Sequence, residues 1–241
     1  MTVLLEAEHL TKSYGALKVV DDLSVSLDAG EALGVVGPNG AGKTTMLNLI
    51  TGTVHPDAGR IVFAGSDISH AAPHERCHAG IGRTYQIPRP FEGMTVFENV
   101  LVGGTFGRRH NERESYDACA LALHRTGLLP RSNTLAGNLT LLERKRLELA
   151  RALATDPRVL LLDEIAGGLT EHEVHSLVAT IKSLGAEGLS IIWIEHIVHA
   201  LLAVVDRLLA IDFGRKVADG EPAVVINSPE VRDVYLGSEA E

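Results

Sequence analysis

One glycine-rich segment has the residue types and the spacing that hold a chain of phosphates. Residues 37–44 read Gly-Pro-Asn-Gly-Ala-Gly-Lys-Thr, which matches the phosphate-loop pattern in full. The glycines let backbone N–H groups turn toward phosphate oxygens, and a helix that begins there adds positive potential. In such a loop Lys43 reaches the β- and γ-phosphates, and the Thr44 hydroxyl holds Mg²⁺. An ordinary glycine-rich turn is the alternative, but the pattern and its position between an apolar segment and a helix favour phosphate binding.

Two adjacent carboxylates follow a second short apolar segment. Asp163 and Glu164 come directly after residues 159–162, which are expected to form a buried strand. Because ligand-binding groups gather at the carboxyl ends of parallel strands, Asp163 is expected beside the phosphate loop, as a second contact for Mg²⁺. A carboxylate at Glu164 can orient or deprotonate an attacking water molecule. The alternative is that both residues only end the strand in solvent.

The segments around these residues alternate between strand and helix patterns. Strand patterns cover residues 3–10, 23–27, 32–36, 60–64, 159–162, 189–194 and 207–211. Helix patterns cover residues 42–52, 73–80, 97–129 with a break around 103–107, 140–155, 171–186 and a segment that starts at 197. This order predicts an α/β fold with a parallel sheet, interrupted by a helical insert over residues 88–156.

Composition and charge limit the class of partner. Hydrophobic residues make up 45% of the 241 residues, which is typical of a globular protein. A formal net charge of −9 argues against nucleic acid and acidic lipid as direct partners, since proteins that bind either of them usually carry a surplus of Lys and Arg. No apolar run reaches the ~20 residues of a membrane span. A role at a membrane would therefore require another chain to hold the protein there.

Further segments carry a resemblance to a known family. They are Gly80–Gln86, Met94–Val100, Arg146–Leu153, Ile194–His196, Ser228–Val231 and Tyr235–Gly237. With the phosphate loop and the Asp-Glu pair, they resemble the ATPase subunits of ABC transporters, and most closely those of branched-chain amino-acid importers. The resemblance covers essentially the whole chain.

The resemblance implies a fold and an activity. The fold would be a single ABC ATPase domain over residues 1–241, with a P-loop (RecA-like) core, an antiparallel N-terminal β-subdomain and an inserted α-helical subdomain. The insert, residues 88–156, would carry the signature motif. ATP hydrolysis would power uptake of branched-chain amino acids or a related small polar solute. A soluble ABC ATPase of DNA repair or translation and the motor of an exporter stay open as alternatives.

The resemblance also implies partners and a location. The partners would be transmembrane permease subunits and a second ATPase subunit, in a homodimer or, as favoured here, a heterodimer. A periplasmic or extracellular solute-binding protein would act indirectly, and nucleic acid would have no part. The chain would then be peripheral at the cytoplasmic face of the cell membrane, held there by the membrane subunits.

Individual residues take roles from the same resemblance. Gln86 is similar to the family's glutamine that touches Mg²⁺ and the attacking water, and His196 to its switch histidine, which contacts the γ-phosphate. Glu164, His196 and Gln86 are therefore the candidate catalytic residues, and Thr44, Gln86 and Asp163 the candidate metal ligands. The candidate nucleotide-binding residues are Tyr14, which would stack on adenine, and Gly37, Asn39, Gly40, Ala41, Gly42, Lys43, Thr44, Thr45 and Thr140. Without the resemblance, Gln86 would be a solvated loop residue, His196 a helix-start residue and Tyr14 a packing residue.

The chain departs from the family at its signature motif. Where the family has Leu-Ser-Gly-Gly-Gln, residues 139–143 read Leu-Thr-Leu-Leu-Glu, and Ile165 replaces the proline that follows the catalytic glutamate. The loop that follows, residues 167–170, reads Gly-Gly-Leu-Thr and lacks the usual acidic or amide end. Thr140 and Glu143 also have the spacing of a helix capping box. The altered signature favours a heterodimer with unequal ATP sites.

Overall fold

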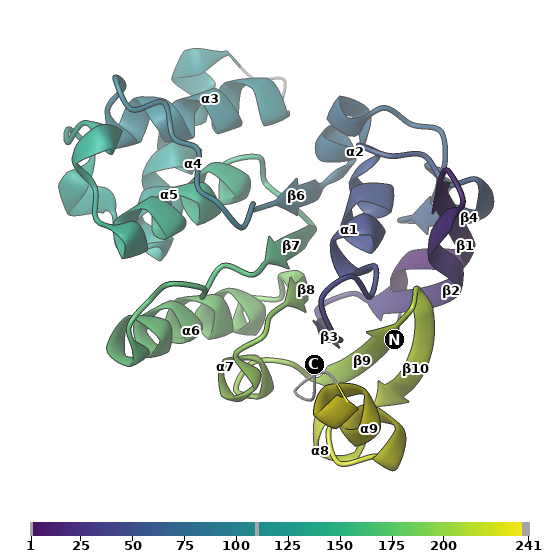
Figure 1. Ribbon diagram of the computed structural model, residues 1–241. Coiled ribbons are helices and arrows are strands. Elements are labelled where there is room, and N and C mark those ends of the chain that lie inside the picture. The colour runs from purple at the N-terminus through teal and green to yellow at the C-terminus, as the bar shows by residue number, and fades with distance from the viewer. Residues whose placement is uncertain (1, 109–110, 238–241) are drawn as a thin grey trace. The chain divides into compact units, whose positions relative to one another are not determined.

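The computed structural model describes residues 2–108 and 111–237 (Figure 1). Contacts divide the chain into two compact units, Met1–Arg76 with Ser190–Glu241, and Cys77–Leu189. The order of strands and helices confirms the predicted α/β fold. The expectation of one domain with a helical insert over residues 88–156 stays a prediction.

The first unit contains an antiparallel sheet built from the N-terminal strands. Its order is β2-β1-β4-β5, formed by β1 (Val3–Tyr14), β2 (Leu17–Asp28), β4 (Ala58–Phe63) and β5 (Ser66–Asp67). Leu23, Val25 and Leu27 of β2 are buried, and the residues between them are more exposed. That alternation is the pattern predicted for residues 23–27, and it arises because successive strand residues face opposite sides of a sheet.

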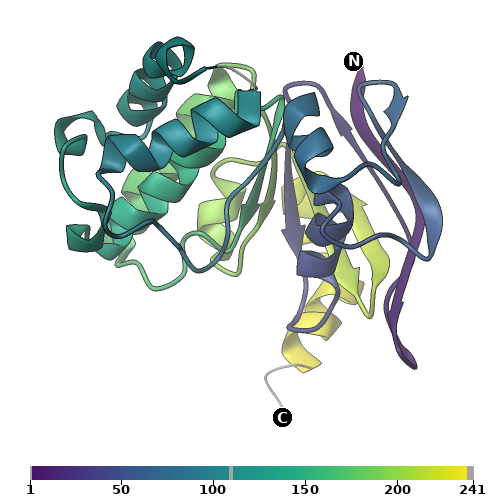
Figure 2. The ribbon, with the colours of Figure 1, turned by 90° about the horizontal axis from the view of Figure 1, so that it is seen from above.

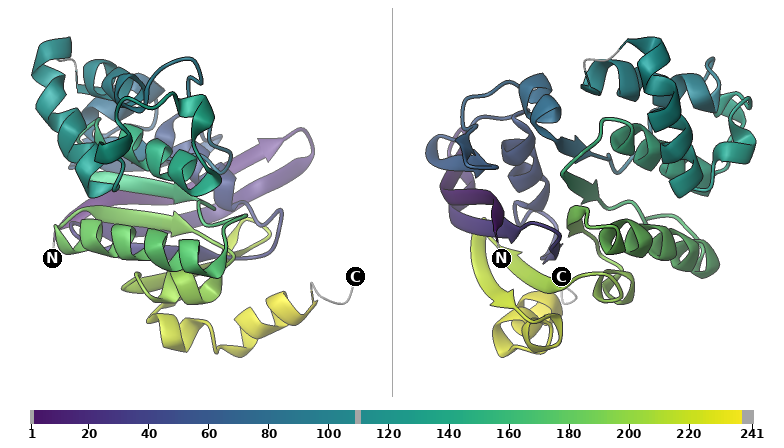
Figure 3. Two further views of the ribbon diagram at one scale, coloured as in Figure 1. Left: turned by 90° about the vertical axis from the view of Figure 1, so that its left-hand side faces the viewer. Right: turned by 180° about the vertical axis from the view of Figure 1, so that it is seen from behind.

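The same unit contains parallel strands around β3 (Ala32–Val36), all five of whose residues are buried. β3 pairs in parallel with β8 (Ser190–Ile194) and with β9 (Arg207–Asp212). β10 (Arg215–Gly220) then runs antiparallel to β9. The short helix α8 (Pro222–Val225) lies against β9 and β10, and α9 (Pro229–Gly237) lies against β10, as Figure 3 shows in yellow. A strand that is covered on both edges and both faces has a continuous apolar sequence. This pattern was the basis for predicting a strand at residues 32–36.

The helix α1 (Lys43–Thr51) follows β3 and ends at Gly52, as predicted. Its C-terminal carbonyls meet the guanidinium of Arg76, which lies in α2 (Pro73–Ala79) and is fully buried. Arg76 donates hydrogen bonds to the carbonyl oxygens of Leu49 and Ile50 over 2.6 and 3.0 Å. A cation at the carboxyl end of a helix satisfies carbonyls that have no partner within the helix and complements the helix dipole. Burial lowers the pKa of Arg76 below its ordinary value.

The second unit combines two parallel strands with four longer helices. β6 (Ile81–Arg83) pairs with β7 (Val159–Asp163). The helices are α3 (Val96–Arg108), α4 (Glu112–Arg125), α5 (Leu141–Leu153) and α6 (Glu171–Ala186), with 3-10 turns at Leu129–Arg131 and Ala136–Asn138. Within this unit α3 packs on α4 and α5, which Figure 2 shows from above in teal.

Another short helix, α7 (Val198–Leu202), belongs to the first unit.

The predicted break around residues 103–107 is wrong, because α3 runs through these residues without interruption. A Cβ atom at Gly103 would lie 2.5 Å from the carbonyl oxygen of Arg151, and one at Gly107 would lie 2.5 Å from Cγ2 of Thr155. A Cβ at Gly104 would lie 2.8 Å from Sγ of Cys119. These glycines therefore let α3 approach its neighbours closely and do not end the helix.

Four helices of the second unit begin with the same local hydrogen-bond pattern. In α5 the Thr140 hydroxyl accepts a hydrogen bond from the backbone N–H of Glu143, and the Glu143 carboxylate accepts one from the N–H of Thr140. Equivalent reciprocal pairs are Thr95 with Glu98, Asn111 with Glu114, and Thr170 with Glu173. The capping box predicted for Thr140 and Glu143 is thus confirmed. Across residues 2–108 and 111–237, none of the helices has the length and apolar character that a membrane crossing requires.

Candidate nucleotide-binding site

The phosphate-loop residues connect β3 to α1 within the first unit. Gly37, Gly40 and Gly42 have φ angles of 152°, 81° and 98°, a range that L side chains rarely adopt. A Cβ atom at Gly37 would lie 2.1 Å from the carbonyl oxygen of Ile211, and one at Gly42 would lie 2.5 Å from that of Val19. Both positions therefore require glycine for space as well as for conformation. Asn39, Gly40 and Thr44 are exposed, while Ala41 is buried and Thr45 is half-buried.

Lys43 is buried at the first turn of α1, with 5% of its surface exposed. Its Nζ donates hydrogen bonds to the carbonyl oxygens of Gly37 and Pro38, over 2.6 and 2.8 Å. The lysine thus folds back over the loop and fixes its shape. A cation held inside a loop of backbone dipoles is suited to an anion as highly charged as a triphosphate.

The start of β2, just after the turn from β1, approaches the phosphate loop. Tyr14 pairs with Leu17 across this turn, and two residues later the carbonyl of Val19 approaches Gly42. Tyr14 is 49% exposed, and Nζ of Lys12 lies 5.9 Å from the centroid of its ring. A half-exposed ring is available for stacking on a flat base. The role of Tyr14 on adenine stays a prediction.

His196 lies two residues after the end of β8, which pairs with β3, the strand that leads into the phosphate loop. The His196 side chain is exposed, and its backbone N–H donates a hydrogen bond to Oε1 of the buried Glu195 over 3.0 Å. This hydrogen bond fixes the backbone conformation just after the strand. The position after the strand is one at which α/β folds bind ligands.

Asp163 ends β7 in the second unit and forms a buried ion pair with Arg83 of β6. Arg83 Nη2 lies 2.8 Å from Asp163 Oδ2, and the two side chains are 6% and 5% exposed. The Arg83 guanidinium carbon also lies 5.0 Å from the ring centroid of Tyr85. Buried charges of this kind persist only when they are paired. The sequence interpretation assigned no role to Arg83, although a cation in so short an apolar strand was a signal.

Glu164 and Gln86 lie in hydrogen-bond contact. Gln86 Nε2 lies 2.5 Å from Glu164 Oε2. Glu164 has a φ angle of 47°, a strained conformation that costs a residue with a long side chain about 1–3 kcal/mol. The structure thus brings together two of the three candidate catalytic residues, within the second unit.

Thr140 is exposed at the start of α5, followed by Leu141 and Leu142 at the positions of the family's two glycines. Glu143 Oε1 accepts a hydrogen bond from Arg131 Nε over 2.9 Å. This hydrogen bond, supported by the cap from Thr140, holds the pKa of Glu143 below its ordinary value. The negative charge of Glu143 is therefore held against the second unit's own backbone and Arg131.

The candidate residues divide between the two units. Those of the first unit are Tyr14, Gly37, Asn39, Gly40, Ala41, Gly42, Lys43, Thr44, Thr45 and His196, and those of the second are Gln86, Thr140, Asp163 and Glu164. Most of them lie at or near the end of a strand or the start of a helix. Such positions are those that a phosphate-binding α/β protein uses.

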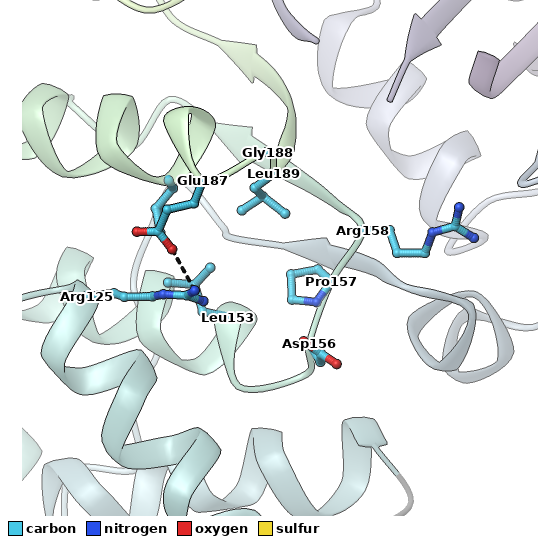
Figure 4. Close-up of a pocket in the computed structure, with 9 residues that line it drawn as sticks. Arg125, Leu153, Asp156, Pro157, Arg158, Glu187, Gly188 and Leu189 are labelled. Carbon is cyan, nitrogen blue, oxygen red and sulfur yellow. Dashed lines mark ion pairs between the residues drawn. The ribbon is translucent and has the colours of Figure 1, made fainter. Parts of the chain in front are cut away.

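A separate pocket of about 210 Å³ in the second unit contains none of these residues. Figure 4 shows that Arg125, in the last turn of α4, reaches toward Glu187, which follows α6, and their charged atoms lie 2.6 Å apart. Leu153, Pro157 and Leu189 form apolar walls. The ion pair complements the carboxyl end of α4 and joins two helix ends, which gives this pocket a structural explanation.

The comparisons with known proteins agree with this geometry. Residues 20–167 match the sequence model of the ABC transporter family, which covers the phosphate loop and the Asp163–Glu164 pair. The chain belongs to the ABC transporter family of ATP-binding proteins. Residues 215–241 match the model named branched-chain amino acid ATP-binding cassette transporter.

Individual members of the ABC family match over almost their full length. The high-affinity branched-chain amino acid transport ATP-binding protein BraF of Pseudomonas aeruginosa is 34% identical, over 97% of this chain and 98% of the relative. The lipopolysaccharide export system ATP-binding protein LptB of Acidithiobacillus ferridurans is 37% identical, over 99% of both chains. The crystal structure of an ATP-binding cassette of an ABC transporter in its ADP conformation superimposes with a TM-score of 0.90. That structure is 31% identical, and the match covers 98% of this chain and 100% of that one.

Membership of the ABC family determines the activity in outline. The family hydrolyses ATP, and this chain is an ATPase subunit of a transporter. ABC ATPase subunits work with membrane permease subunits and dimerise. The P-loop fold predicted from the sequence is confirmed by the solved ABC cassette.

Proposed function

We propose that this ABC ATPase powers the uptake of branched-chain amino acids, or of a related small polar solute, from the cytoplasmic face of the cell membrane. The observation that carries the proposal is the similarity to BraF over 97% of this chain. The match of residues 215–241 to the branched-chain amino acid cassette model adds to it. The chain would be peripheral, held by permease subunits, and a separate solute-binding protein would select the solute.

The donor atoms predicted for the metal suit Mg²⁺. Thr44 offers a hydroxyl, Asp163 a carboxylate and Gln86 an amide oxygen, and Mg²⁺ binds hard oxygen donors together with nucleotide phosphates. When bound, Mg²⁺ would neutralise charge that develops on the transferred phosphoryl group. Lys43 would bind the β- and γ-phosphates, and Tyr14 would stack on the base.

The hydrolytic step would then depend on the candidate catalytic residues and on Thr140. Glu164 would accept a proton from the attacking water or orient it. Gln86, which contacts Glu164, would hold the water in line, and His196 would contact the γ-phosphate. Thr140 would bind the γ-phosphate of the ATP molecule held by a second ATPase subunit. These roles require closure of two subunits on two ATP molecules.

The altered signature favours a heterodimer for this closure. Leu141 and Leu142 keep their backbone N–H donors but add side chains where the family has glycine. The site formed by this chain's phosphate loop and the partner's signature would carry most of the hydrolysis. The site formed by this chain's own signature would be the weaker one.

A reconstituted transporter tests the direction and the solute. The chain would be purified with permease subunits, the partner ATPase and a solute-binding protein, and placed in vesicles with ATP on the ATPase side. ATP-dependent accumulation of labelled leucine, isoleucine or valine is expected, and it should stop with Lys43→Ala. Uptake of none of these, with ATP hydrolysis intact, would contradict the proposed solute.

An exporter is the second candidate function, because the lipopolysaccharide export protein LptB is 37% identical over 99% of this chain. The same vesicles distinguish the two directions. ATP-dependent release of a lipid-linked substrate from the membrane to an acceptor, without solute accumulation, would favour export.

A further inference from the structure

Arg83 places a long cationic side chain inside a short buried strand. It lies opposite Leu161 in the parallel pairing of β6 with β7. Residues two apart on a strand face the same side of the sheet, so Leu161 and Asp163 share that side. The Arg83 side chain therefore reaches diagonally to Asp163, where Nη2 and Oδ2 are 2.8 Å apart.

The charges of this pair are almost completely removed from water. The Arg83 and Asp163 side chains are 6% and 5% exposed. A carboxylate taken out of water requires a compensating charge. Loss of one partner leaves the other charge buried and unpaired, at a high cost in free energy. Because a guanidinium stays charged under all physiological conditions, Arg83 provides that compensation permanently.

The second contact of Arg83 limits how its guanidinium can turn. The guanidinium carbon is 5.0 Å from the centroid of the Tyr85 ring, a distance within the range of a cation–π contact. Tyr85 is 53% exposed and lies one residue before Gln86. The guanidinium is thus fixed by a carboxylate and by a ring on the same segment.

The position of this pair matters because Asp163 is the carboxylate that would contact the metal. A divalent cation near Asp163 would be repelled by the guanidinium at short range, and the repulsion is strong where water is excluded. A cation that arrives with a triphosphate brings several oxygen ligands and negative charges with it. A cation that arrives alone has no such compensation.

We infer that Arg83 is a positioning residue that keeps Asp163 oriented and charge-balanced without a metal, so that a divalent cation binds tightly only together with the nucleotide. The inference rests on the proposed role of Asp163 as a Mg²⁺ contact. The alternative is that Arg83 only joins β6 to β7 and has no influence on metal binding.

The test measures how tightly the full-length protein binds Mn²⁺ at about pH 8. Mn²⁺ serves as a spectroscopic probe for Mg²⁺. The fraction of free Mn²⁺ would be followed by electron paramagnetic resonance without nucleotide. Arg83→Gln removes the charge and keeps an amide that can donate to Asp163, and Arg83→Met removes both. Arg83→Lys keeps the charge. Binding of a fluorescent ATP analogue in EDTA would report whether each variant is folded.

A matched control exists in the same unit. Arg151 Nη1 lies 2.8 Å from Oε1 of Glu148, a carboxylate only 8% exposed, and the Arg151 guanidinium carbon lies 5.3 Å from the Phe91 ring centroid. Arg151→Met therefore removes the same kind of ion pair and ring contact at a place that offers no predicted metal ligand. Its effect on Mn²⁺ should be nil.

The inference predicts that Arg83→Gln and Arg83→Met bind Mn²⁺ about tenfold more tightly than the wild type, or better, without nucleotide. Arg83→Lys should stay near the wild type. Unchanged Mn²⁺ affinity in a neutral variant that binds the ATP analogue would overturn the inference. So would loss of analogue binding by both neutral variants while Arg83→Lys retains it, since Arg83 would then serve folding alone. If the wild type binds Mn²⁺ no better with ATP than without, the proposed Mg²⁺ site itself fails.

Discussion

The side-chain amide of Gln86 donates a hydrogen bond to Glu164 across 2.5 Å, within the second unit of the chain. The two residues come from the segment after β6 and from the end of β7, which are paired strands. The contact holds the carboxylate proposed as the base in a defined direction, despite the unfavourable φ angle of 47° at Glu164. It also places a loop glutamine where any movement of that loop would alter the carboxylate.

Glu164→Gln should keep ATP binding and lose hydrolysis. The amide preserves the shape of the side chain and can still accept from Gln86, but it cannot take a proton, so turnover should fall by about 10²-fold or more. Nucleotide affinity by calorimetry and phosphate release would be measured on one preparation. Glu171→Gln is the matched control, because Glu171 is 84% exposed at the start of α6. Turnover near the wild-type value would remove Glu164 from the catalytic role.

Lys43→Ala should lose most of its affinity for ATP. The lysine binds the loop carbonyls of Gly37 and Pro38, so the change removes both a cation and the contact that shapes the loop. A loss of about 100-fold in affinity, near 3 kcal/mol, is expected. Lys182→Ala on the exposed surface of α6 is the control. Equal affinities for the two variants in a calorimetric titration would count against the whole phosphate site.

Glu143→Gln should reduce stability in a way that depends on pH. The hydrogen bond from Arg131 lowers the pKa of Glu143 in the folded protein, so ionised Glu143 stabilises the fold above its unfolded pKa of about 4.3. That contribution is lost as the pH falls through the lower folded pKa. Because Arg131 is 48% exposed, the effect near pH 7 should be about 1 kcal/mol or less.

Urea unfolding of both proteins over a series of pH values measures this difference directly. Glutamine can serve in a capping box as glutamate does, so the comparison isolates the ion pair with Arg131 from the helix cap. The two stability curves should converge in acid. If the difference in unfolding free energy stays constant down to the most acidic pH, the charge of Glu143 does not contribute to that difference.

Gly103→Ala should destabilise the second unit although alanine favours helices. The new Cβ would stand 2.5 Å from the carbonyl oxygen of Arg151, and such overpacking costs about 1–3 kcal/mol. That cost exceeds the gain of about 1 kcal/mol in helix propensity. Gly93→Ala is the control, since its Cβ would meet nothing within 4 Å. Thermal unfolding that ranks the two variants in the opposite order would contradict the close packing of α3 on α5.

The proposed heterodimer predicts unequal effects of equivalent substitutions in the reconstituted transporter. Glu164→Gln in this chain should abolish nearly all transport, because the ATP site on this chain's phosphate loop is the main hydrolytic one. The matching change in the partner ATPase should leave a substantial part of the transport activity. Transport rates of the two single variants decide the matter. Equal losses, or a greater loss from the partner's substitution, would refute unequal sites of this kind.

The parts of the fold that follow from short-range rules were predictable from the sequence. Helix α1 begins and ends at the glycines that were expected to bound it, and α6 spans Glu171–Ala186 as the pattern predicted. The capping box at Thr140 likewise depends on residues three apart. In these cases the deciding interactions lie within one turn of helix, so local sequence contains them.

Features that depend on distant segments were not predictable in the same way. The glycines of α3 were interpreted as a break, because their purpose is visible only when Arg151 and Thr155 lie against them. Strand β6 has three residues, too few for a periodic pattern. The ion pair of Arg83 with Asp163 spans 80 residues, and no local rule relates them. The catalytic and binding roles of the candidate residues stay predictions that the experiments above test.

The buried guanidinium at the end of α1 also limits which sequences this fold can accept. A Cβ atom at Gly52 would stand 2.6 Å from Nε of Arg76, in addition to the strain of its φ angle of 77°. Any side chain at position 52 would therefore displace the cation that completes the helix leading from the phosphate loop. A shorter residue at position 76 would make room for that side chain but would leave the carbonyls of Leu49 and Ile50 without their donor. Positions 52 and 76 should thus behave as one unit in mutagenesis, with a double replacement costing less than the sum of the single ones.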